Sequence, residues 1–599
     1  MRSLQALLIL LSVTFYANSQ TQSDLRILAE SWEWKRLLQY NEANVSDIES
    51  KAFFLSPDGQ FDPYSELKTF IEHASEVMAC RFPARYAFAQ HHNLVGYYDL
   101  ANCDDFTEFM RTSEPEGVTL IFADGYLKNP ASFHGHLFIR IDQSGKGDGL
   151  LATSLNFGAI VPDDDDPLTY IVKGIFGGYD ARFSAQPFYR HHISYGQQEL
   201  RDLWEYKLDL TPYKKQLLTG LLFELSQIKY QYFFIDENCA YFVARALEIV
   251  APEFLVKSSD KTVIPSEVIK SVMSAGDQQM VSEVTLIKSQ QKKFQNHFHV
   301  LTKRQQVALA DWIKRDKGLF DGLSKPSQKK VLITLGSYYA FRIQQSPDNE
   351  NLKQARRDVI KSLLQYEPGN TIKLEEEQRV YPHEGQAAAL LRTELLSLDG
   401  NLGGKITMRP TYYDRIQPSG GRPNQSAMAM GQIGFYFDND HLELDHLYGI
   451  HVESFDISST GVEGDGGESW TLTLGAQRNR LRSIDAKVAA FVAGGYGIAT
   501  KWRGIVPYLF GHGRVHMKET ERDNHSLTAS MRAGLEWRWF GEKAFCEAEK
   551  PFSITTSVTS QDLIGRCHLS LNSTNNSDFR FTVEAQNTLL ISLAASIYF

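Results

Sequence analysis

The sequence predicts a multidomain exported protein in which an α+β domain and a helical connector precede a C-terminal antiparallel β-barrel of about ten strands. Three observations predict this fold class. The chain opens with a short apolar segment typical of export. Strand patterns followed by helix patterns surround Cys239 in the first half. From about residue 390 onward the hydrophobic period becomes two, as in antiparallel strands.

The N-terminus has the pattern of a secretory signal peptide. Arg2 precedes the apolar run 7–13, and the small residues Ala17 and Ser19 stand at cleavage spacing. No later segment has about 18 consecutive apolar residues free of charge, so we expect no spanning helix in the mature chain. The predicted boundaries are 1–19 for the signal peptide, 20–110 for a small helical domain, 111–295 for the α+β domain, 296–389 for the connector and 390–599 for the barrel.

Charge and composition exclude some partners. The formal net charge of −10 and the pI near 6.0 leave no basic stripe to neutralise phosphates, so we expect no nucleic-acid partner. His297 and His299 have no cysteine or carboxylate set nearby, so we expect no metal site. We expect no cofactor either.

The five cysteines are informative because disulfides persist in exported chains. Cys80 and Cys103 flank one short segment, and Cys546 and Cys567 flank another. A bridge that closes a loop of about twenty residues contributes roughly 3 kcal/mol, so each pair could form one, although spacing does not fix connectivity. Cys239 is then the odd cysteine, and a lone thiol in an oxidising compartment invites a functional interpretation.

The segment 111–295 mixes strands and helices. Apolar runs bounded by Gly and Asp predict strands at 118–122, 136–141 and 168–172. Apolar residues at helical spacing predict one helix near 212–229 and another that begins at Cys239. The segments on either side, before 110 and after 296, have mainly helical patterns, and no motif in them indicates a function.

Long alternating segments predict the barrel. In 470–477, 527–539 and 589–599 an apolar residue alternates with a polar or small one. A soluble sandwich would alternate in the same way, with its apolar face inside. The length of about ten residues per segment favours a membrane barrel, and closure would be required because an open edge in lipid leaves backbone groups unpaired.

Two further features favour the membrane alternative. Trp537 and Trp539 stand near a strand end, where a membrane barrel carries aromatic residues. The final Phe599 resembles the terminal aromatic residue of outer-membrane barrels. We expect the polar segments 461–468 and 542–550 to be external loops or turns.

The sharpest local pattern surrounds Cys239. Asn238 is a good N-cap, which places Cys239 in the first turn of a helix. Free N–H groups and the positive end of the helix dipole stabilise a thiolate there, and the thiolate is the nucleophile in cysteine chemistry. The alternative is a packing role, because Cys239 shares a helix face with Phe242 and a buried cysteine often simply packs.

A histidine base would complete a thiol site. His134 and His136 open a predicted strand, and alternation puts His136 on one face with Phe138 and Arg140. A thiolate–imidazole pair requires this ring to approach the helix N-terminus from a neighbouring strand. Sequence does not show that proximity, and a histidine at a strand start is more often a surface or satisfied residue.

These motifs together resemble a known family. A strand-opening Gly135-His136 followed much later by Asn238-Cys239 at a helix start resembles the permuted papain-like thiol fold, and 238–243 is similar to a segment of the lecithin:retinol acyltransferase group. More specifically, 135–138, 199–206 and 232–239 resemble the Lnb-type periplasmic domain over about 115–290, a family tied to bacterial lipoprotein N-acylation. The flanking segments look like the companion domains of its long members.

The resemblance implies a ping-pong acyl transfer on phospholipid and lipoprotein substrates, with the N-terminal domains in the periplasm and the barrel in the outer membrane. Cys239 would take an acyl chain as a thioester and yield it to an amine. His136 would act as base, and backbone N–H groups at the start of the Cys239 helix would hold the oxyanion.

The remaining site residues are less constrained. Asn156 is expected to orient His136 from the neighbouring strand, with His134, His191 and His192 as alternatives. The residues expected to contact substrate are His134, Asn238 and Tyr241. Where the acyltransferase group has Glu-His after its cysteine, this chain has Ala240-Tyr241.

Two other functions stay open, because a fold does not fix a substrate. One is a cysteine peptidase or amidase that cuts peptidoglycan or peptides. The other is a non-enzymatic envelope barrel with a binding domain, in which Cys239 is merely buried.

Overall fold

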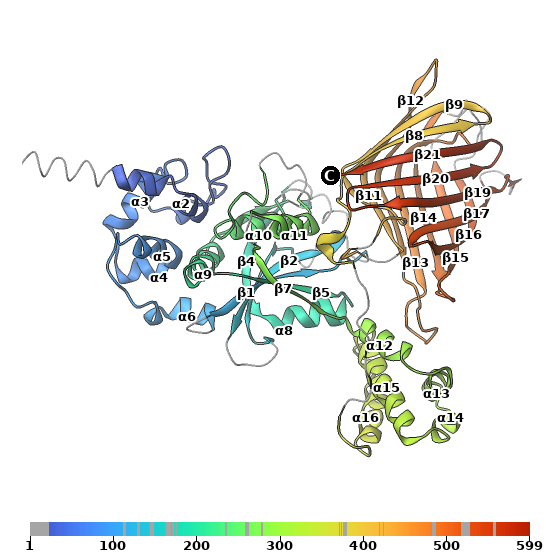
Figure 1. Ribbon diagram of the computed structural model, residues 1–599, viewed down its shortest axis with the longest axis horizontal. Coiled ribbons are helices and arrows are strands. Elements are labelled where there is room, and N and C mark those ends of the chain that lie inside the picture. The colour runs from blue at the N-terminus through green and yellow to red at the C-terminus, as the bar shows by residue number, and fades with distance from the viewer. Residues whose placement is uncertain are drawn as a thin grey trace, which may run out of the picture. The chain divides into compact units, whose positions relative to one another are not determined.

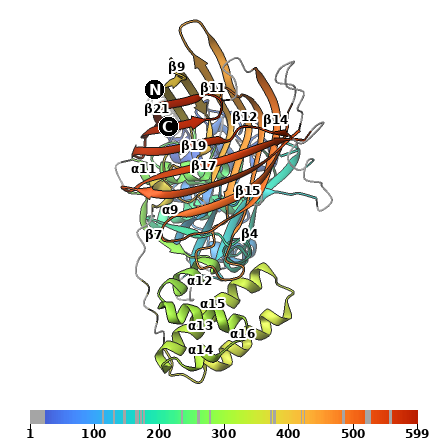
Figure 2. The same cartoon turned by 90° about the vertical axis from the view of Figure 1, so that its right-hand side faces the viewer.

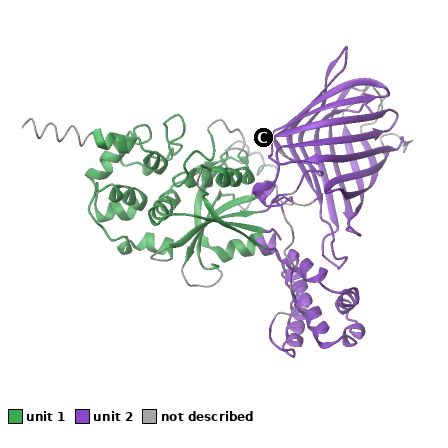
Figure 3. Cartoon of the chain, in the orientation of Figure 1, with its two compact units in different colours: residues 1–123, 135–195, 203–287 green, residues 124–134, 196–202, 288–599 purple. Residues whose placement is uncertain are grey.

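The computed structural model describes residues 23–599 except 112–114, 128–131, 144–148, 163–168, 170–172, 175–176, 234–236, 258–262, 277–278, 370–371, 373, 375–379, 419, 423–424, 482–486, 517–526 and 555–558. The predicted signal peptide, 1–19, lies outside the described residues. The chain forms two compact units (Figure 3). Unit 1 comprises residues up to 123, 135–195 and 203–287, and unit 2 comprises 124–134, 196–202 and 288–599.

Unit 1 opens with short helices that start at strong caps. Ser31, Asp62 and Ser75 each accept a hydrogen bond from a backbone N–H in the first turn that follows. Cys80 and Cys103 form a disulfide, one of the two that the cysteine spacing allows. The helices are α2 Trp32–Leu37, α3 Pro63–Glu72, α4 Glu76–Arg81, α5 Pro83–His91 and α6 Asp104–Met110, with 3-10 turns η1 Lys51–Phe53 and η2 Leu100–Asn102.

The rest of unit 1 is built on a seven-stranded antiparallel sheet in the order β6-β4-β3-β2-β1-β5-β7 (Figure 1). Its strands are β1 Pro115–Ala123, β2 His136–Gln143, β3 Thr153–Ala159, β4 Tyr179–Pro187, β5 Leu203–Leu208, β6 Tyr230–Tyr232 and β7 Val281–Ile287. Its helices are α8 Phe188–His191, α9 Pro212–Ser226, α10 Cys239–Leu247 and α11 Pro265–Ser274, with the π-helical segment His192–Gln198 after α8.

Helices α9 and α10 pack against the sheet, α9 on β1 and β4 and α10 on β2 and β3. The predicted strands at 118–122 and 136–141 and both predicted helices are confirmed. The predicted strand at 168–172 lies almost entirely outside the described residues.

A buried ion cluster joins the N-terminal helices to the sheet domain. The Glu224 carboxylate of α9 accepts hydrogen bonds from the backbone N–H groups of Ala84 and Arg85 at 2.9 and 3.2 Å. It thereby caps α5, whose own N-cap residue supplies no side-chain hydrogen bond. The Arg85 guanidinium also pairs with Glu66 of α3 at 2.5 Å. The N-terminal helices and the sheet domain therefore share one core.

Unit 2 begins with helices around a separate aromatic core. Thr302 and Gln305 form a capping box at the start of α13. Phe294, Tyr338 and Phe341 are buried together, and the rings of Phe294 and Tyr338 lie 5.2 Å apart. The helices are α12 Gln290–His299, α13 Lys303–Ile313, α14 Gly318–Asp321, α15 Lys325–Gln345 and α16 Glu350–Leu363, followed by the 3-10 turn η5 Pro382–Glu384.

A closed antiparallel barrel follows, with twelve strands among the described residues (Figure 2). Pairing of β11 with β9 closes it, so no strand edge of the ring is left open. The strands are β8 Leu390–Leu398, β9 Asn401–Arg409, β11 Ala427–Phe437, β12 Leu442–Phe455, β13 Glu468–Arg478, β14 Val488–Ala499, β15 Val506–His516, β16 Leu527–Trp539, β17 Glu542–Ser553, β19 Ile564–Ser573, β20 Ser577–Ala585 and β21 Leu589–Tyr598. Short β10 Thr411–Tyr413 pairs with β11, and β18 Thr559–Ser560 pairs with β17.

The predicted count of about ten strands is therefore wrong. One reason is β17, because its segment 542–550 was expected to be a loop. Its charged Glu547 and Glu549 face the barrel interior and pair with Arg566 of β19. Charged residues in a sequence suggest a loop, but in β17 they belong to a strand whose side chains line a polar barrel interior. Of the other expected loop, residues 461–467 lie in the connection between β12 and β13, and Glu468 begins β13. This connection lies at the end of the barrel where β8 begins.

The exposure of the two faces of the barrel strands decides between the soluble sandwich and the membrane barrel that the sequence left open. On β13, Leu472 and Leu474 are 39% and 50% exposed, while Thr473 between them lines the interior. On β16, Met531 is 56% exposed while Arg532 is buried inside. A soluble sandwich would bury the apolar face, so the outward apolar face identifies an outer-membrane-type barrel.

Cys546 and Cys567 form the second predicted disulfide, between opposite positions of β17 and β19. Within the part of the chain that the structure describes, no helix is long and apolar enough to cross a membrane.

Candidate functional site

The start of α10 is fixed by its cap. The side-chain oxygen of Asn238 accepts hydrogen bonds from the N–H groups of Ala240 and Tyr241 at 2.9 and 3.3 Å. Its amide group donates to the carbonyl of Val263 at 2.8 Å. The predicted N-cap is therefore confirmed, and it ties the helix start to the segment before α11.

Cys239 is the first residue of α10 and takes no part in either disulfide. Its side chain is 6% exposed. At this position the helix dipole and the first-turn N–H groups favour a thiolate over a thiol. One turn later the ring of Phe242 stacks on Phe157 of β3 with centroids 4.3 Å apart, which fixes the helix on the sheet.

His136 and Asn156 lie together on neighbouring strands. His136 opens β2, and its Nε2 is hydrogen-bonded to Oδ1 of Asn156 on β3. With the amide oxygen as acceptor, the proton lies on Nε2, and Nδ1 carries the lone pair of a base. Gly135 precedes this strand at φ +90, and a Cβ there would meet the ring of Phe122 at 2.5 Å, so only glycine fits.

The topology brings His136 and Cys239 to the same end of the sheet. Tyr232, the last residue of β6, pairs with Tyr179, the first residue of β4, and β3 ends and β2 begins at that end too. The chain leaves β6 there and enters α10 within a few residues. A thiol and an imidazole can therefore meet where β2 and α10 begin.

The register adds a constraint on how they meet. Asn156 pairs with Phe138, so the side chains of His136, Phe138 and Asn156 share one face of the sheet. Phe157 belongs to the other face, where α10 packs. A Cys239–His136 pair thus has to form around the end of the sheet, beyond the first residue of β2.

The other predicted site residues have different surroundings. The Tyr241 hydroxyl donates to the Asp47 carboxylate at 2.9 Å, and burial raises its pKa. His134 is half-buried, and the loss of solvent around its ring lowers its pKa to about 4, so the ring is neutral at neutral pH. His191, an alternative partner for His136, contacts Gln186 at 2.8 Å and lies over the ring of Phe138.

Sequence reasoning missed Asp47. Besides Tyr241, it binds Arg245 of α10 at 2.8 Å, and Arg245 also pairs with Glu248. Arg36 of α2 reaches the same Glu248 at 3.2 Å. No motif marks an aspartate nearly two hundred positions before the helix it contacts. Among the described residues, no group of three or more His, Cys, Asp or Glu side chains could hold a metal ion.

These features define a class: an exported envelope protein that joins an α/β domain with a capped, helix-initial cysteine to a closed antiparallel barrel with an apolar outer face. Family models agree with the motif prediction. Residues 105–275 match the Lnb N-terminal periplasmic domain. Residues 26–92 match one domain of unknown function (DUF7843), and residues 379–591 match another (DUF7840).

No curated protein matches the sequence. Among solved structures the chain is similar to a KdgM porin in complex with disordered oligogalacturonate, at 6% identity over 35% of this chain and 99% of that one, with a TM-score of 0.22. It is also similar to a loop-deletion mutant of OmpT, an outer membrane protein of Vibrio cholerae (7%, 35% and 97%, TM-score 0.18). A third is the Acinetobacter baumannii outer membrane protein Omp33 (12%, 36% and 99%, TM-score 0.16). At these TM-scores the likenesses add nothing to what the strand pairing establishes.

Proposed function

We propose that this protein is an outer-membrane-anchored cysteine acyltransferase that acts on lipid or lipoprotein substrates. The observation that carries the proposal is Cys239, a cysteine outside both disulfides at a capped helix start. The match of residues 105–275 to the Lnb N-terminal periplasmic domain supports it. The permuted papain-like fold, with its histidine before its cysteine, is part of the same proposal.

In the first half-reaction, the Cys239 thiolate attacks the carbonyl carbon of an acyl ester. Backbone N–H groups in the first turn of α10 stabilise the negative charge that develops on the carbonyl oxygen. The ester C–O bond breaks, and the imidazolium of His136 gives its proton to the leaving alkoxide. The products are an acyl thioester on Cys239 and a lysolipid alcohol.

In the second half-reaction, an acceptor amine attacks the thioester. A C–N bond forms, the C–S bond breaks, and the amine proton passes to His136, which restores the starting thiolate–imidazolium pair. Asn156 keeps the proton of the neutral ring on Nε2, so that Nδ1 is the nitrogen that exchanges protons. His134, Asn238 and Tyr241 are the residues proposed to contact the substrate. The Asn238 side chain also has a structural duty, because it caps α10.

The test is a labelled-lipid experiment on the full-length protein in vesicles. We expect an acyl mass on the Cys239 peptide that hydroxylamine removes, as it removes thioesters. Cys239→Ala should abolish the label, and His136→Ala should reduce it strongly. His73→Ala, a change of an exposed histidine in the same unit, is the matched control and should leave the label unchanged.

Other outcomes would assign the remaining functions. A cleaved muropeptide or peptide without an acyl intermediate would indicate the peptidase or amidase. A folded protein that gives neither an acyl label on the Cys239 peptide nor a cleaved product would indicate a binding domain in which Cys239 only packs. Either result contradicts the acyltransferase.

A further inference from the structure

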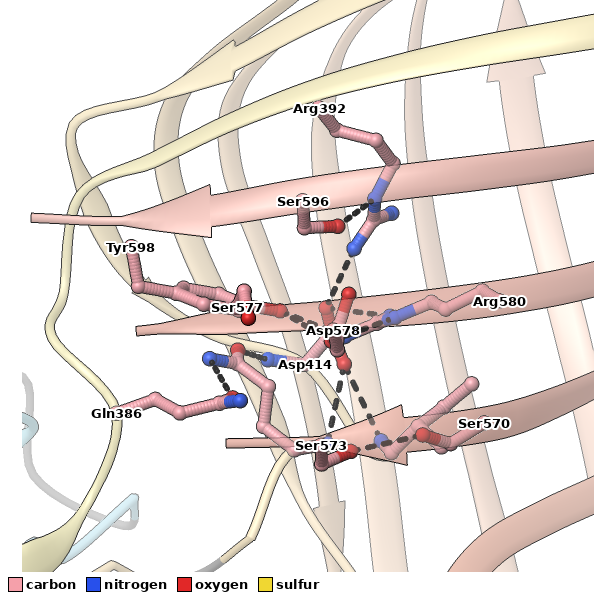
Figure 4. A network of polar contacts seen from close by, with 12 residues as sticks. Gln386, Arg392, Asp414, Ser570, Ser573, Ser577, Asp578, Arg580, Ser596 and Tyr598 are labelled. Atoms are coloured by element: carbon pink, nitrogen blue, oxygen red, sulfur yellow. Dashed lines mark hydrogen bonds and ion pairs between the residues drawn. The ribbon is translucent and has the colours of Figure 1, made fainter. Parts of the chain in front are cut away.

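A short segment between β10 and β11 crosses the interior of the barrel. We call residues 414–417 the plug. On one side, the Asp414 carboxylate binds the guanidinium groups of Arg392 of β8 at 3.3 Å and Arg580 of β20 at 2.9 Å. Figure 4 shows these side chains converging on Asp414 from the barrel wall. Arg409 of β9 adds a third contact at 3.4 Å.

The next residue binds the opposite wall. The Arg415 guanidinium lies 3.4 Å from Glu536 of β16, and it is 3.5 Å from both Glu453 of β12 and Glu547 of β17. It also donates to the hydroxyl of Tyr508 of β15 at 3.0 Å. In the twelve-strand ring, β8 and β9, which hold Asp414, stand opposite β15 and β16, which hold Arg415.

The backbone of the plug is fixed as well. Lys543 of β17 donates to the carbonyl oxygens of Arg415 and Gln417 at 3.1 and 3.2 Å. The Gln417 side chain accepts from Arg409 at 2.9 Å and donates to Gln386 at 3.0 Å. Arg415 and Gln417 are 3% exposed, so both side chains are almost fully surrounded by protein atoms.

Elsewhere in the lumen, the described side chains leave open space. A cavity of about 530 Å³ lies inside the barrel, with walls of charged and polar side chains such as Lys405, Arg514 and Glu549. Its lining reaches from the strand ends at Arg480 to Glu547, one of the residues that hold Arg415. Space for a polar passage therefore exists along the barrel, and it ends at the plug.

We propose that the plug seals the barrel at the end where β8 begins, so that the barrel anchors the chain without conducting. Asp414 and Arg415 hold the plug in place, because each forms ion pairs with side chains of at least three strands. The lumen beyond is a polar vestibule closed at its base. This proposal does not depend on the chemistry of Cys239.

The experiment compares four full-length proteins in planar bilayers and in liposome-swelling assays. They are the wild type, the double variant Asp414→Ala/Arg415→Ala, a variant with residues 414–417 replaced by four glycines, and Arg480→Ala. The last is a matched control, because Arg480 is a buried arginine paired with Glu443 at 2.6 Å and Asp445 at 3.5 Å but stands after the far end of β13. Resistance of the unheated barrel to SDS verifies folding.

We expect no conductance steps and no sugar-driven swelling from the wild type or from Arg480→Ala. The double variant and the glycine variant should both show stepwise conductance and rapid swelling. A wild type that conducts steadily overturns the proposal. So does a folded glycine variant that stays silent, or a control that conducts as readily as the double variant, because the leak would then come from general loosening. If the double variant fails to fold, the wild-type and glycine-variant traces decide.

Discussion

Removing the carboxylate of Asp47 should loosen the helix that carries Cys239. Asp47 accepts a hydrogen bond from Tyr241, which lies two residues after the cysteine. It also forms an ion pair with Arg245, one helical turn further along α10. Asp47→Ala deletes both contacts and leaves the buried Arg245 with Glu248 as its remaining carboxylate partner. Asp47→Asn keeps an oxygen that can accept hydrogen bonds but removes the charge.

The expected cost follows from burial. Breaking a buried ion pair by removing one partner costs about 3–5 kcal/mol. The Asp47 side chain is 19% exposed and Arg245 keeps Glu248, so we expect the alanine variant to lose about 2–3 kcal/mol. The asparagine variant should lose about 1–2 kcal/mol, because it retains the hydrogen bonds.

Cys239 itself reports the effect. The other four cysteines are in disulfides, so iodoacetamide modifies only this thiol in the folded, unreduced protein. Because the thiol is 6% exposed, its alkylation depends on opening of the helix or of unit 1. Where opening is fast and reversible, a loss of about 2 kcal/mol raises the alkylation rate about 30-fold, read by mass spectrometry of the Cys239 peptide.

Asp180→Ala is the matched control. Its partner Lys229 lies 3.4 Å away, and both side chains are about two-thirds exposed or more, so the expected loss is below about 0.5 kcal/mol. An Asp47→Ala protein that is alkylated no faster than Asp180→Ala would refute the reasoning, because Asp47 would then hold nothing in place.

Three more predictions concern stability. Burial lowers the pKa of His191 to about 4, below its value in an unfolded chain, so unit 1 should lose stability as pH falls from about 6.5 towards 4; His191→Phe should reduce that loss in urea unfolding at several pH values. Replacing Cys80 and Cys103 by serine should cost about 3 kcal/mol in the same measurement. Leu474→Arg on the outer face should cost the barrel about 2–4 kcal/mol in vesicle refolding, whereas Thr473→Arg, facing the lumen, should be tolerated; equal costs would contradict the assigned faces.

Local signals were enough to place the start of the cysteine helix. An asparagine before an apolar stretch of helical period predicts a cap, and the hydrogen bonds that Asn238 accepts from the N–H groups of the first turn confirm it. The long alternating strands were equally readable, because the segments predicted at 470–477, 527–539 and 589–599 each fall on one strand of the barrel. In these places short-range physics decides the structure.

The sequence patterns did not predict contacts between residues that lie far apart in the chain. Glu224 accepts a capping hydrogen bond from Ala84, 140 positions before it, and Asp47 accepts one from Tyr241, 194 positions after it. The plug residues Asp414 and Arg415 sit in a connection without any motif, and their partners come from seven strands. Charged residues in β17 even argued against a strand, because sequence patterns cannot tell a polar lumen from water.

A barrel lumen sealed by the plug also limits how a lipid substrate could reach the thiol of Cys239. Transfer of an acyl chain into the lumen is unfavourable, because the chain would leave hydrocarbon for a charged, hydrated space lined by groups such as Arg532 and Glu453. If the plug closes that space, small polar molecules are excluded as well. The acyl donor of the proposed reaction must then come from the membrane leaflet or the compartment that the Lnb-type domain occupies. Opening the plug should accordingly leave acylation of Cys239 unchanged, and a label that rises only in the glycine variant would mean that substrate passes through the barrel.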